Sequence, residues 1–358
     1  ATATLEMGLN LPARQVVLYD MQGFDGTGFE PLPVNTVWQR AGRAGRPGLD
    51  PEGEAVLMAP TWDRVAAQYP RGRFEPIRSR LARPQALAEQ ILAEVTTGMA
   101  RTLPQLERVM DSSLASQQGQ RLKVEETTRE MLEAGMLREE EGNERTILHA
   151  TRLGRIACRH QLQPVTVLQL RSFLERYQEF TDFDLLMLVT STSDCEPVLP
   201  VDFEDLECLA EDLSGQPSRL FNNLDEALSI LQVSGRRLLA SLKTSLVLWR
   251  WTVLGDAELV AEEDGCYPFE IVRLLESADR LLLSAASIRR LIDEPFPTEE
   301  GEEPAPKSAC LLRMELLRQK VVNGIDGPAA SLTLVEGIGA SWARKLAGHG
   351  IGDLDHLA

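Results

Sequence analysis

The most informative stretch of this sequence runs from residue 39 to residue 48: Gln39-Arg40-Ala41-Gly42-Arg43-Ala44-Gly45-Arg46-Pro47-Gly48. Gly42 and Gly45 remove side chains where a backbone must come close to a neighbouring surface. Arg43 and Arg46 are three residues apart, so on a helical turn both would project from one face toward one anion. Guanidinium is a permanent, forked cation that suits phosphate oxygens. The stretch therefore predicts a phosphate-sensing surface, with the basic start of a surface helix as the alternative.

The segments around this stretch indicate an α/β unit over residues 1–83. Residues 15–19 and 55–58 are short apolar runs typical of strands. Residues 22–29, between them, form a glycine-rich turn. No strand or phosphate loop precedes Ala1, so we expect only the C-terminal part of such a domain.

Two motifs of this unit resemble a known family. Residues 39–48 resemble the sixth motif of superfamily-two helicases in its Ski2-like spelling, Q-x-x-G-R-x-G-R-P-G, and residues 3–13 resemble the fifth motif of the same group. The motifs stand in the family order, with the strand at residues 16–19 between them. The resemblance implies that residues 1–83 are the C-terminal part of the second RecA-like motor domain of a helicase.

The resemblance also implies roles for individual side chains. Three residues of the sixth motif would reach an ATP molecule bound on the other motor domain: Gln39, Arg43 and Arg46. Thr2 would contact the nucleic-acid backbone, and Gly8 and Asn10 would couple that contact to the nucleotide. The sequence contains neither a G-x-x-x-x-G-K-[ST] loop nor a D-E-x-H motif. We therefore expect ATP and Mg²⁺ to act in the intact protein, and this chain alone to bind neither and to be inactive.

The glycine-rich turn at residues 22–29 lies where DNA-unwinding members of the family have a β-hairpin. That hairpin wedges the duplex apart at the junction with the single strand. Phe24 and Phe29 flank the turn, and an aromatic ring there could stack on the last base pair and offset part of its unstacking. An ordinary surface hairpin with a glycine turn is an equally good interpretation.

Residues 84–162 have the pattern of a winged helix. An apolar stripe begins at Leu87 with helical spacing, a second helix opens at Leu103, and residues 124–137 form a third. Residues 137–150 then make a hairpin-like return. The third helix carries glutamates that would repel a major groove, namely Glu125, Glu126, Glu130 and Glu133. The resemblance implies a packing hinge rather than a reader of DNA sequence.

Residues 163–328 are predicted to form a helical bundle. Within it, residues 269–282 resemble the ratchet helix with which DNA-repair Ski2-like helicases grip single strands. Arg273 and Arg280 are seven residues apart and share one face of that helix, which suits successive phosphates or a stacked base. Many relatives have tryptophan where this chain has Arg280. Surface pairing of these arginines with Glu276 or Asp279 is the alternative.

Residues 329–358 are predicted to be a truncated helix-hairpin-helix. Gly337 and Gly339 expose backbone N–H groups near a helix N-terminus, which is a ready phosphate site. Arg344 and Lys345 follow within the next helix and are further candidates for nucleic-acid contact. A purely structural helix pair is the alternative.

Composition sets limits on the protein class. The chain has 358 residues, 43% of them hydrophobic, which suggests two or three domains at roughly 150 residues each. The five cysteines and four histidines are scattered, so neither a disulfide framework nor a metal site is predicted. No apolar run reaches the ~18 residues that span a bilayer, and no leader precedes Met7. We expect a soluble, cytoplasmic protein associated with the nucleoid and not with a membrane.

The charge distribution limits how this protein could bind nucleic acid. A net charge of -17 weakens broad electrostatic attraction to phosphates. The excess acid lies in residues 164–330, which hold 30 acidic and 15 basic residues. Acidic runs are typical of solvated faces and linkers. A localised basic channel is compatible with this distribution.

These features predict a multidomain, mainly α protein: part of a RecA-like α/β domain, a winged helix, a helical ratchet bundle and a helix-hairpin-helix. The resemblance implies an ATP-dependent DNA helicase, most similar to the DNA-repair type, that moves along single-stranded or forked DNA. Its first partner would be the missing N-terminal motor domain of the same polypeptide. A Ski2-like RNA helicase and a non-enzymatic nucleic-acid or protein-binding scaffold are the alternatives.

Overall fold

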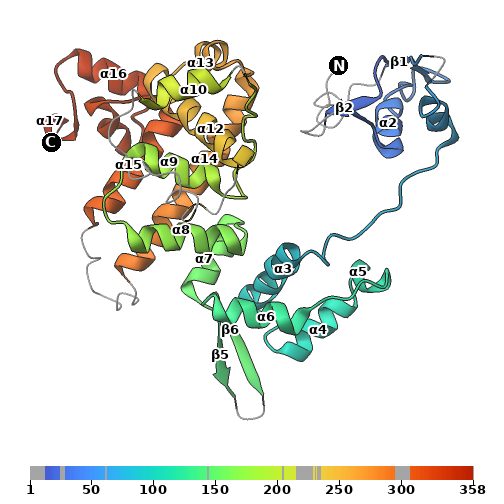
Figure 1. The fold of residues 1–358 in the computed structure, drawn as a ribbon, viewed down its shortest axis with the longest axis horizontal. Coiled ribbons are helices and arrows are strands. Elements are labelled where there is room, and N and C mark those ends of the chain that lie inside the picture. The colour runs from blue at the N-terminus through green and yellow to red at the C-terminus, as the bar shows by residue number, and fades with distance from the viewer. Residues whose placement is uncertain are drawn as a thin grey trace. The chain divides into compact units, whose positions relative to one another are not determined.

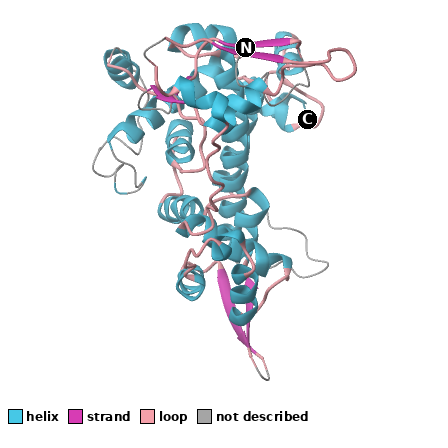
Figure 2. Ribbon diagram, turned by 90° about the vertical axis from the view of Figure 1, so that its right-hand side faces the viewer, coloured by secondary structure: helices cyan, strands magenta, loops and turns pink. Residues whose placement is uncertain are grey.

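The computed structural model of the chain has two compact units, residues 1–78 and residues 79–358 (Figure 1). Helices make up most of it, as predicted for a mainly α protein (Figure 2). No helix among the described residues is long and apolar enough to cross a membrane. The division into four domain types stays a prediction. The structure describes residues 13–24, 29–60, 63–142, 145–203, 205–214, 229, 231, 235–294 and 307–357.

The first unit contains the predicted α/β pattern. Its elements are β1 (Gln15–Leu18), β2 (Gln22–Phe24), β3 (Phe29–Pro31), α2 (Val34–Ala41), β4 (Glu54–Leu57) and the 3-10 helix η1 (Ala66–Arg71). Strands β1 and β4 pair in parallel, with Gln15 opposite Glu54, so both predicted strands are confirmed. Strands β2 and β3 pair antiparallel, which places a hairpin where the glycine-rich turn was predicted.

A small core holds these elements together. Its buried residues are Leu18, Met21, Val37, Ala66 and Tyr69. The Tyr69 hydroxyl donates to the Leu32 carbonyl at 2.7 Å, and the Trp38 indole N–H donates to the Tyr69 carbonyl at 2.7 Å. Both aromatic polar groups are thus satisfied within the core. These bonds fix α2, and with it the start of the 39–48 stretch, against η1.

The second unit begins with helices and a β-hairpin. The elements are α3 (Pro84–Thr97), α4 (Leu103–Asp111), α5 (Leu114–Gln117), α6 (Val124–Glu133), β5 (Leu137–Glu141), β6 (Thr146–Ala150) and α7 (Arg152–His160). The hairpin projects beyond the helices (Figures 1 and 2). The prediction of one helix over residues 124–137 is wrong at its end. Gly135 has φ +68°, which ends the helix and lets Leu137 start a strand.

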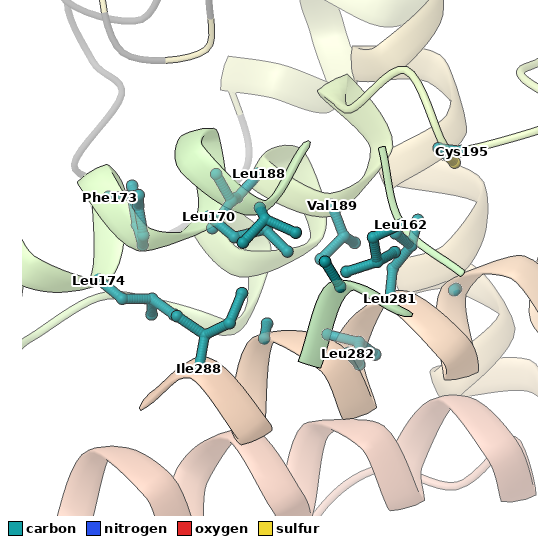
Figure 3. Packing of buried hydrophobic residues seen from close by; sticks show 14 of the residues in the cluster. Leu162, Leu170, Phe173, Leu174, Leu188, Val189, Cys195, Leu281, Leu282 and Ile288 are labelled. Atoms are coloured by element: carbon teal, nitrogen blue, oxygen red, sulfur yellow. The ribbon is translucent and has the colours of Figure 1, made fainter. Parts of the chain in front are cut away.

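The rest of the unit is a helical bundle, as the leucine-rich periodicity predicted. Its helices are α8 (Pro164–Arg176), α9 (Asp182–Ser191), α10 (Asp205–Ser214), α12 (Gly235–Leu254), α13 (Ala257–Asp264), α14 (Pro268–Asp293) and α15 (Ala309–Asn323). Helix α9 is buried from residue 183 to 191 and packs against α12 and α14. Leu170, Leu188, Leu281 and Ile288 meet in the core between α8, α9 and α14 (Figure 3). Helix α14 is therefore covered on most of its sides.

The chain continues past the bundle into a smaller cluster. Its elements are the 3-10 helix η3 (Pro328–Leu334), α16 (Ala340–Gly348) and α17 (Leu354–Leu357). Ile325, Ala330, Leu332 and Ala343 form its buried core. The segment before the glycine hairpin was predicted as an ordinary helix, and the structure shows a 3-10 helix there.

Candidate nucleotide and nucleic-acid sites

The backbone of the 39–48 stretch is fixed by an isolated bridge beside the parallel sheet. Helix α2 ends at Ala41, so Arg43 and Arg46 do not lie on a helical turn, and the geometry expected from their spacing is wrong. Instead, Ala13 pairs in parallel with Ala44. The Ala13 N–H donates to the Arg43 carbonyl at 3.0 Å, and the Gly45 N–H donates to the Ala13 carbonyl at 2.7 Å. The sheet, rather than the helix, therefore positions both arginines.

Glycines allow this loop to fold against its own chain. Gly45 has φ +95°, which an L side chain rarely adopts. A Cβ at Gly53 would lie 2.3 Å from the carbonyl carbon of Ala44. Gly45 was expected where the backbone comes close to a neighbouring surface, and that surface is the backbone of residues 52–53. Gly53 was not expected to take part.

Arg46 presents a fork that already holds an anion. Its Nε and Nη2 donate to the two carboxylate oxygens of Asp50 at 2.7 and 2.8 Å, and its backbone N–H donates to Asp50 Oδ2 at 3.1 Å. The side-chain bond lowers the pKa of Asp50 and raises the pKa of Arg46. Gln39 is exposed near the end of α2, and Arg43 is half-buried. Because carboxylate and phosphate accept the same two-pronged bond, Asp50 occupies the donors that a phosphate would use.

Several predicted contacts of the first unit lie outside what the structure describes. Thr2, Gly8 and Asn10 are among the undescribed residues. The backbones of Phe24 and Phe29 face each other across β2 and β3, but their side chains are outside the described part. Their roles therefore stay predictions.

On α14 the two predicted gripping arginines have different surroundings. Arg273 is exposed. Arg280 donates to the carbonyls of His160 and Gln161 at 3.2 and 3.3 Å through Nη1, and to the carbonyl of Asp194 at 2.8 Å through Nη2. The guanidinium thus binds the C-terminal end of α7, where carbonyls lack helical partners. These three bonds go to main-chain carbonyls, whereas the alternative prediction paired Arg280 with Glu276 or Asp279.

The residues predicted to bind DNA near the C-terminus also have different surroundings. Gly337 has φ +87°, and Gly339 is the N-cap of α16. Arg344 Nη2 donates to the Gly324 carbonyl at 2.7 Å. Lys345 Nζ lies 5.0 Å from the centre of the Trp342 ring, and both side chains are exposed. Of the two predicted cations, Lys345 lies against the exposed Trp342 ring, whereas Arg344 donates to a main-chain carbonyl.

The sequence is similar to proteins named ATP-dependent DNA helicase Hel308. It is 30% identical over 365 residues to that of Methanocella arvoryzae, covering 99% of this chain and 47% of the relative. Identity is 28% to that of Pyrobaculum calidifontis and 27% to that of Pyrococcus horikoshii, covering 100% of this chain and 48% of each relative. The matched region is the C-terminal part of these helicases.

Over its whole length the chain is homologous to proteins named ATP-dependent DNA helicase Hel308. It spans about half the length of the curated relatives it matches. No protein-family model matches the sequence. Among the residues that the structure describes, no group of three or more His, Cys, Asp or Glu side chains is placed to hold a metal ion.

Two residues were missed by sequence analysis although a local signal was present. Asp50 lies four residues after Arg46, a spacing at which opposite charges often pair. Trp342 is a large aromatic residue directly after the glycine hairpin and is 60% exposed. An exposed tryptophan beside a lysine is a stronger nucleic-acid signal than the lysine alone.

Proposed function

We propose that this chain is the C-terminal part of an ATP-dependent DNA helicase that translocates on single-stranded DNA during DNA repair. The observation that carries the proposal is the alignment of the whole chain with the C-terminal part of proteins named ATP-dependent DNA helicases. The Arg46 fork and the long helix α14 with exposed Arg273 support it. The first partner in this proposal is an N-terminal motor domain of the same polypeptide.

Gln39, Arg43 and Arg46 would contact ATP held by that motor domain. The fit rests on Arg46, whose two side-chain nitrogens are already arranged to hold a two-oxygen anion. ATP supplies the phosphoryl-transfer chemistry when bound, with Mg²⁺ ligands that this chain would not provide. In such transfers the arginine stabilises charge on the equatorial oxygens. Arg46 would exchange Asp50 for phosphate, so nucleotide binding would release the residue 46–50 turn.

Single-stranded DNA would run along exposed cations of the second unit. Arg273 on α14 and Lys345 on α16 are both exposed, as phosphate contacts require. Forked DNA as substrate, and the hairpin of β2 and β3 as the wedge, belong to the same proposal. The bonds of Arg280 do not favour a direct contact with DNA, because releasing them would leave the part-buried carbonyls of His160 and Asp194 without this donor.

The test replaces Arg46 or Arg43 by alanine in the intact protein. DNA-stimulated ATP hydrolysis should fall by about 10³-fold, the lower end of the effect of removing such an arginine. Arg73→Ala is the matched control, since Arg73 is an exposed arginine of the same unit outside the motif. It should leave turnover unchanged.

Two results would contradict the proposal. One is unchanged ATP hydrolysis in both motif variants, which would favour a scaffold. The other is unwinding of tailed RNA, but not tailed DNA, by the intact protein, which would favour the RNA helicase. Magnesium-dependent ATP hydrolysis by this chain alone would refute the assignment of the phosphate and metal ligands to the other motor domain.

A further inference from the structure

The C-terminal ends of two bundle helices meet at a pair of glycines. Gly255 follows α12 and Gly324 follows α15, with φ +64° and +59°. A Cβ at Gly255 would lie 2.4 Å from the Gly324 carbonyl oxygen, and a Cβ at Gly324 would lie 2.9 Å from the Gly255 Cα. The Trp251 indole N–H donates to the Val321 carbonyl at 2.7 Å beside this contact. The two helix ends are therefore in direct backbone contact.

The Arg344 guanidinium reaches this junction from α16. Its Nη2 donates to the Gly324 carbonyl at 2.7 Å. A Cβ at Gly255 would lie 2.5 Å from the same Nη2, so the guanidinium fills the space that the glycine leaves. Helix C-termini carry unpaired carbonyls and a partial negative charge that favour a cation. Two such ends meet here, so the site is well matched to arginine.

Arg344 as a whole is exposed, but its part-buried bond to Gly324 holds one side of helix α16, while the other side makes no such bond to the described residues. Ala343, next to Arg344, is fully buried in the C-terminal core. Trp342 is 60% exposed, and Lys345 lies against its ring. Residues three apart on a helix are neighbours, so Trp342 and Lys345 form one surface. Anchoring the first side fixes where the second side points.

We propose that Arg344 is a positioning residue, which locks α16 to the ends of α12 and α15 and thereby presents Trp342 and Lys345 to single-stranded DNA. This inference rests on the proposed function for its ligand, but not for the lock itself. It replaces the sequence-based expectation that Arg344 contacts DNA directly. Trp342 would stack on a base, and Lys345 would contact a phosphate.

The experiment measures two properties of the intact protein. The first is amide hydrogen exchange of α16 without DNA, with α14 as an internal reference. The second is the affinity for oligo-dT over a salt series. Arg344→Ala should raise exchange in α16 alone and leave the salt slope unchanged. Lys345→Ala should leave exchange unchanged and reduce the slope by about 0.7, the value for one single-strand phosphate contact.

Further variants distinguish the anchoring of α16 by Arg344 from the effect of its positive charge. Gly255→Ala keeps the Arg344 charge but puts a methyl group against both the Gly324 carbonyl and the guanidinium, so it should raise exchange in α16 and also at the ends of α12 and α15. Arg344→Lys can still donate to a carbonyl and should restore part of the protection. Trp342→Ala should weaken oligo-dT binding about tenfold, within the range for one lost base stack.

Opposite results would overturn the inference. If Arg344→Ala reduces the salt slope as Lys345→Ala does and leaves exchange of α16 unchanged, Arg344 is a phosphate contact and not an anchor. Unchanged exchange in Gly255→Ala would refute the lock in the same way. If the unmodified protein does not bind oligo-dT, the proposed function fails, while the exchange data still decide whether the lock exists.

Discussion

Three arginines to which motifs gave functional roles donate to different kinds of acceptor, although other arginines of the second unit pair with carboxylates. In the first unit, Arg46 donates to the carboxylate of Asp50, a largely buried side chain of the same turn. In the second unit, Arg280 and Arg344 donate to main-chain carbonyls at the ends of helices. Arg237 does the same, with its Nη2 at 2.7 Å from the Thr192 carbonyl. Sequence motifs predicted functional roles for Arg46, Arg280 and Arg344. The three differ in the structure, because one donates to a carboxylate and two donate to main-chain carbonyls.

The difference matters because the two acceptors are not equally replaceable. A carboxylate can leave the Arg46 donors when a phosphate takes its place, since both anions accept the same two-pronged bond. A part-buried carbonyl at a helix end has no such alternative, and an unsatisfied buried acceptor costs about 1–3 kcal/mol. We therefore expect Arg46 to be available for a ligand, and Arg280 and Arg344 to hold the fold. The predictions below test this distinction on matched residues.

The largest expected effect in the bundle is that of Arg280→Ala. It removes three bonds to main-chain carbonyls that join α14 to the end of α7 and to the loop after α9. We expect the free energy of unfolding to fall by about 2–3 kcal/mol, since these bonds carry a charged donor. Urea denaturation followed by tryptophan fluorescence measures it.

Arg273→Ala is the matched control for that experiment. Arg273 lies on the same face of α14, two turns earlier, and is exposed. Its replacement should change the unfolding free energy by less than about 0.5 kcal/mol. If Arg280→Ala keeps the free energy of unfolding of the unmodified chain but loses affinity for single-stranded DNA, Arg280 contacts DNA and does not stabilise the fold.

Elements set by local rules were predicted well from the sequence. Within the predicted bundle, α15 spans Ala309–Asn323, because Ser308 caps its start and Gly324, at φ +59°, ends it. The strand at residues 15–18 was visible as an apolar run. The end of α6 was misplaced although Gly135 gave the signal.

The partners of the site residues could not be predicted, because they lie far away along the chain. Arg280 bonds to residues 119 and 120 positions earlier. Arg344 Nη2 donates to the carbonyl of Gly324 and lies beside Gly255. No local sequence pattern indicates either contact. The roles of the arginines at 43 and 46 stay predictions, and the bridge between Ala13 and Ala44 replaces the helical turn expected for them. Motifs identify such residues, and only packing shows what each side chain contacts.

A smaller effect is expected at a charged cluster between α9, α15 and the C-terminal segment. Lys320 Nζ donates to Asp182 at 2.9 Å and pairs with Asp326 at 2.7 Å. Burial alone would lower the pKa of Lys320, but hydrogen bonds to Asp326 and Asp182 raise it. Burial would raise the pKa of Asp326, but the bonds from Lys320 and the Gly327 N–H lower it.

The signs give a pH window. A lowered Asp326 pKa adds stability above the carboxyl's unfolded value, near 4, and this is lost as pH falls through the folded value. A raised Lys320 pKa adds stability below its unfolded value, near 10.5, which is lost as pH rises through the folded value. Asp326→Asn should therefore destabilise the chain by about 1 kcal/mol at pH 7, after allowance for solvent screening, and by less at pH 3.

Urea denaturation between pH 3 and pH 7 checks this prediction. Glu336→Gln is the control, because Glu336 is an exposed carboxylate of the same C-terminal segment. It should leave the pH dependence unchanged. An Asp326→Asn variant that keeps the full acid-induced loss of stability would show that the cluster does not act as described. In that case the Asp326 carboxylate could be lost from its ion pair at little cost in stability, as we expect for Asp50 in the first unit.

The smallest effect on the fold, and the sharpest test of the comparison, concerns Arg273. An exposed arginine that contacts one phosphate contributes about 0.7 to the salt slope of single-strand binding. Arg273→Ala in the intact protein should lower the slope by that amount without changing stability. Arg273→Lys should keep the slope, because a phosphate contact needs charge, but should lower affinity if the guanidinium stacks on a base. An unchanged slope in Arg273→Ala would mean that exposure alone does not identify the gripping residues of α14.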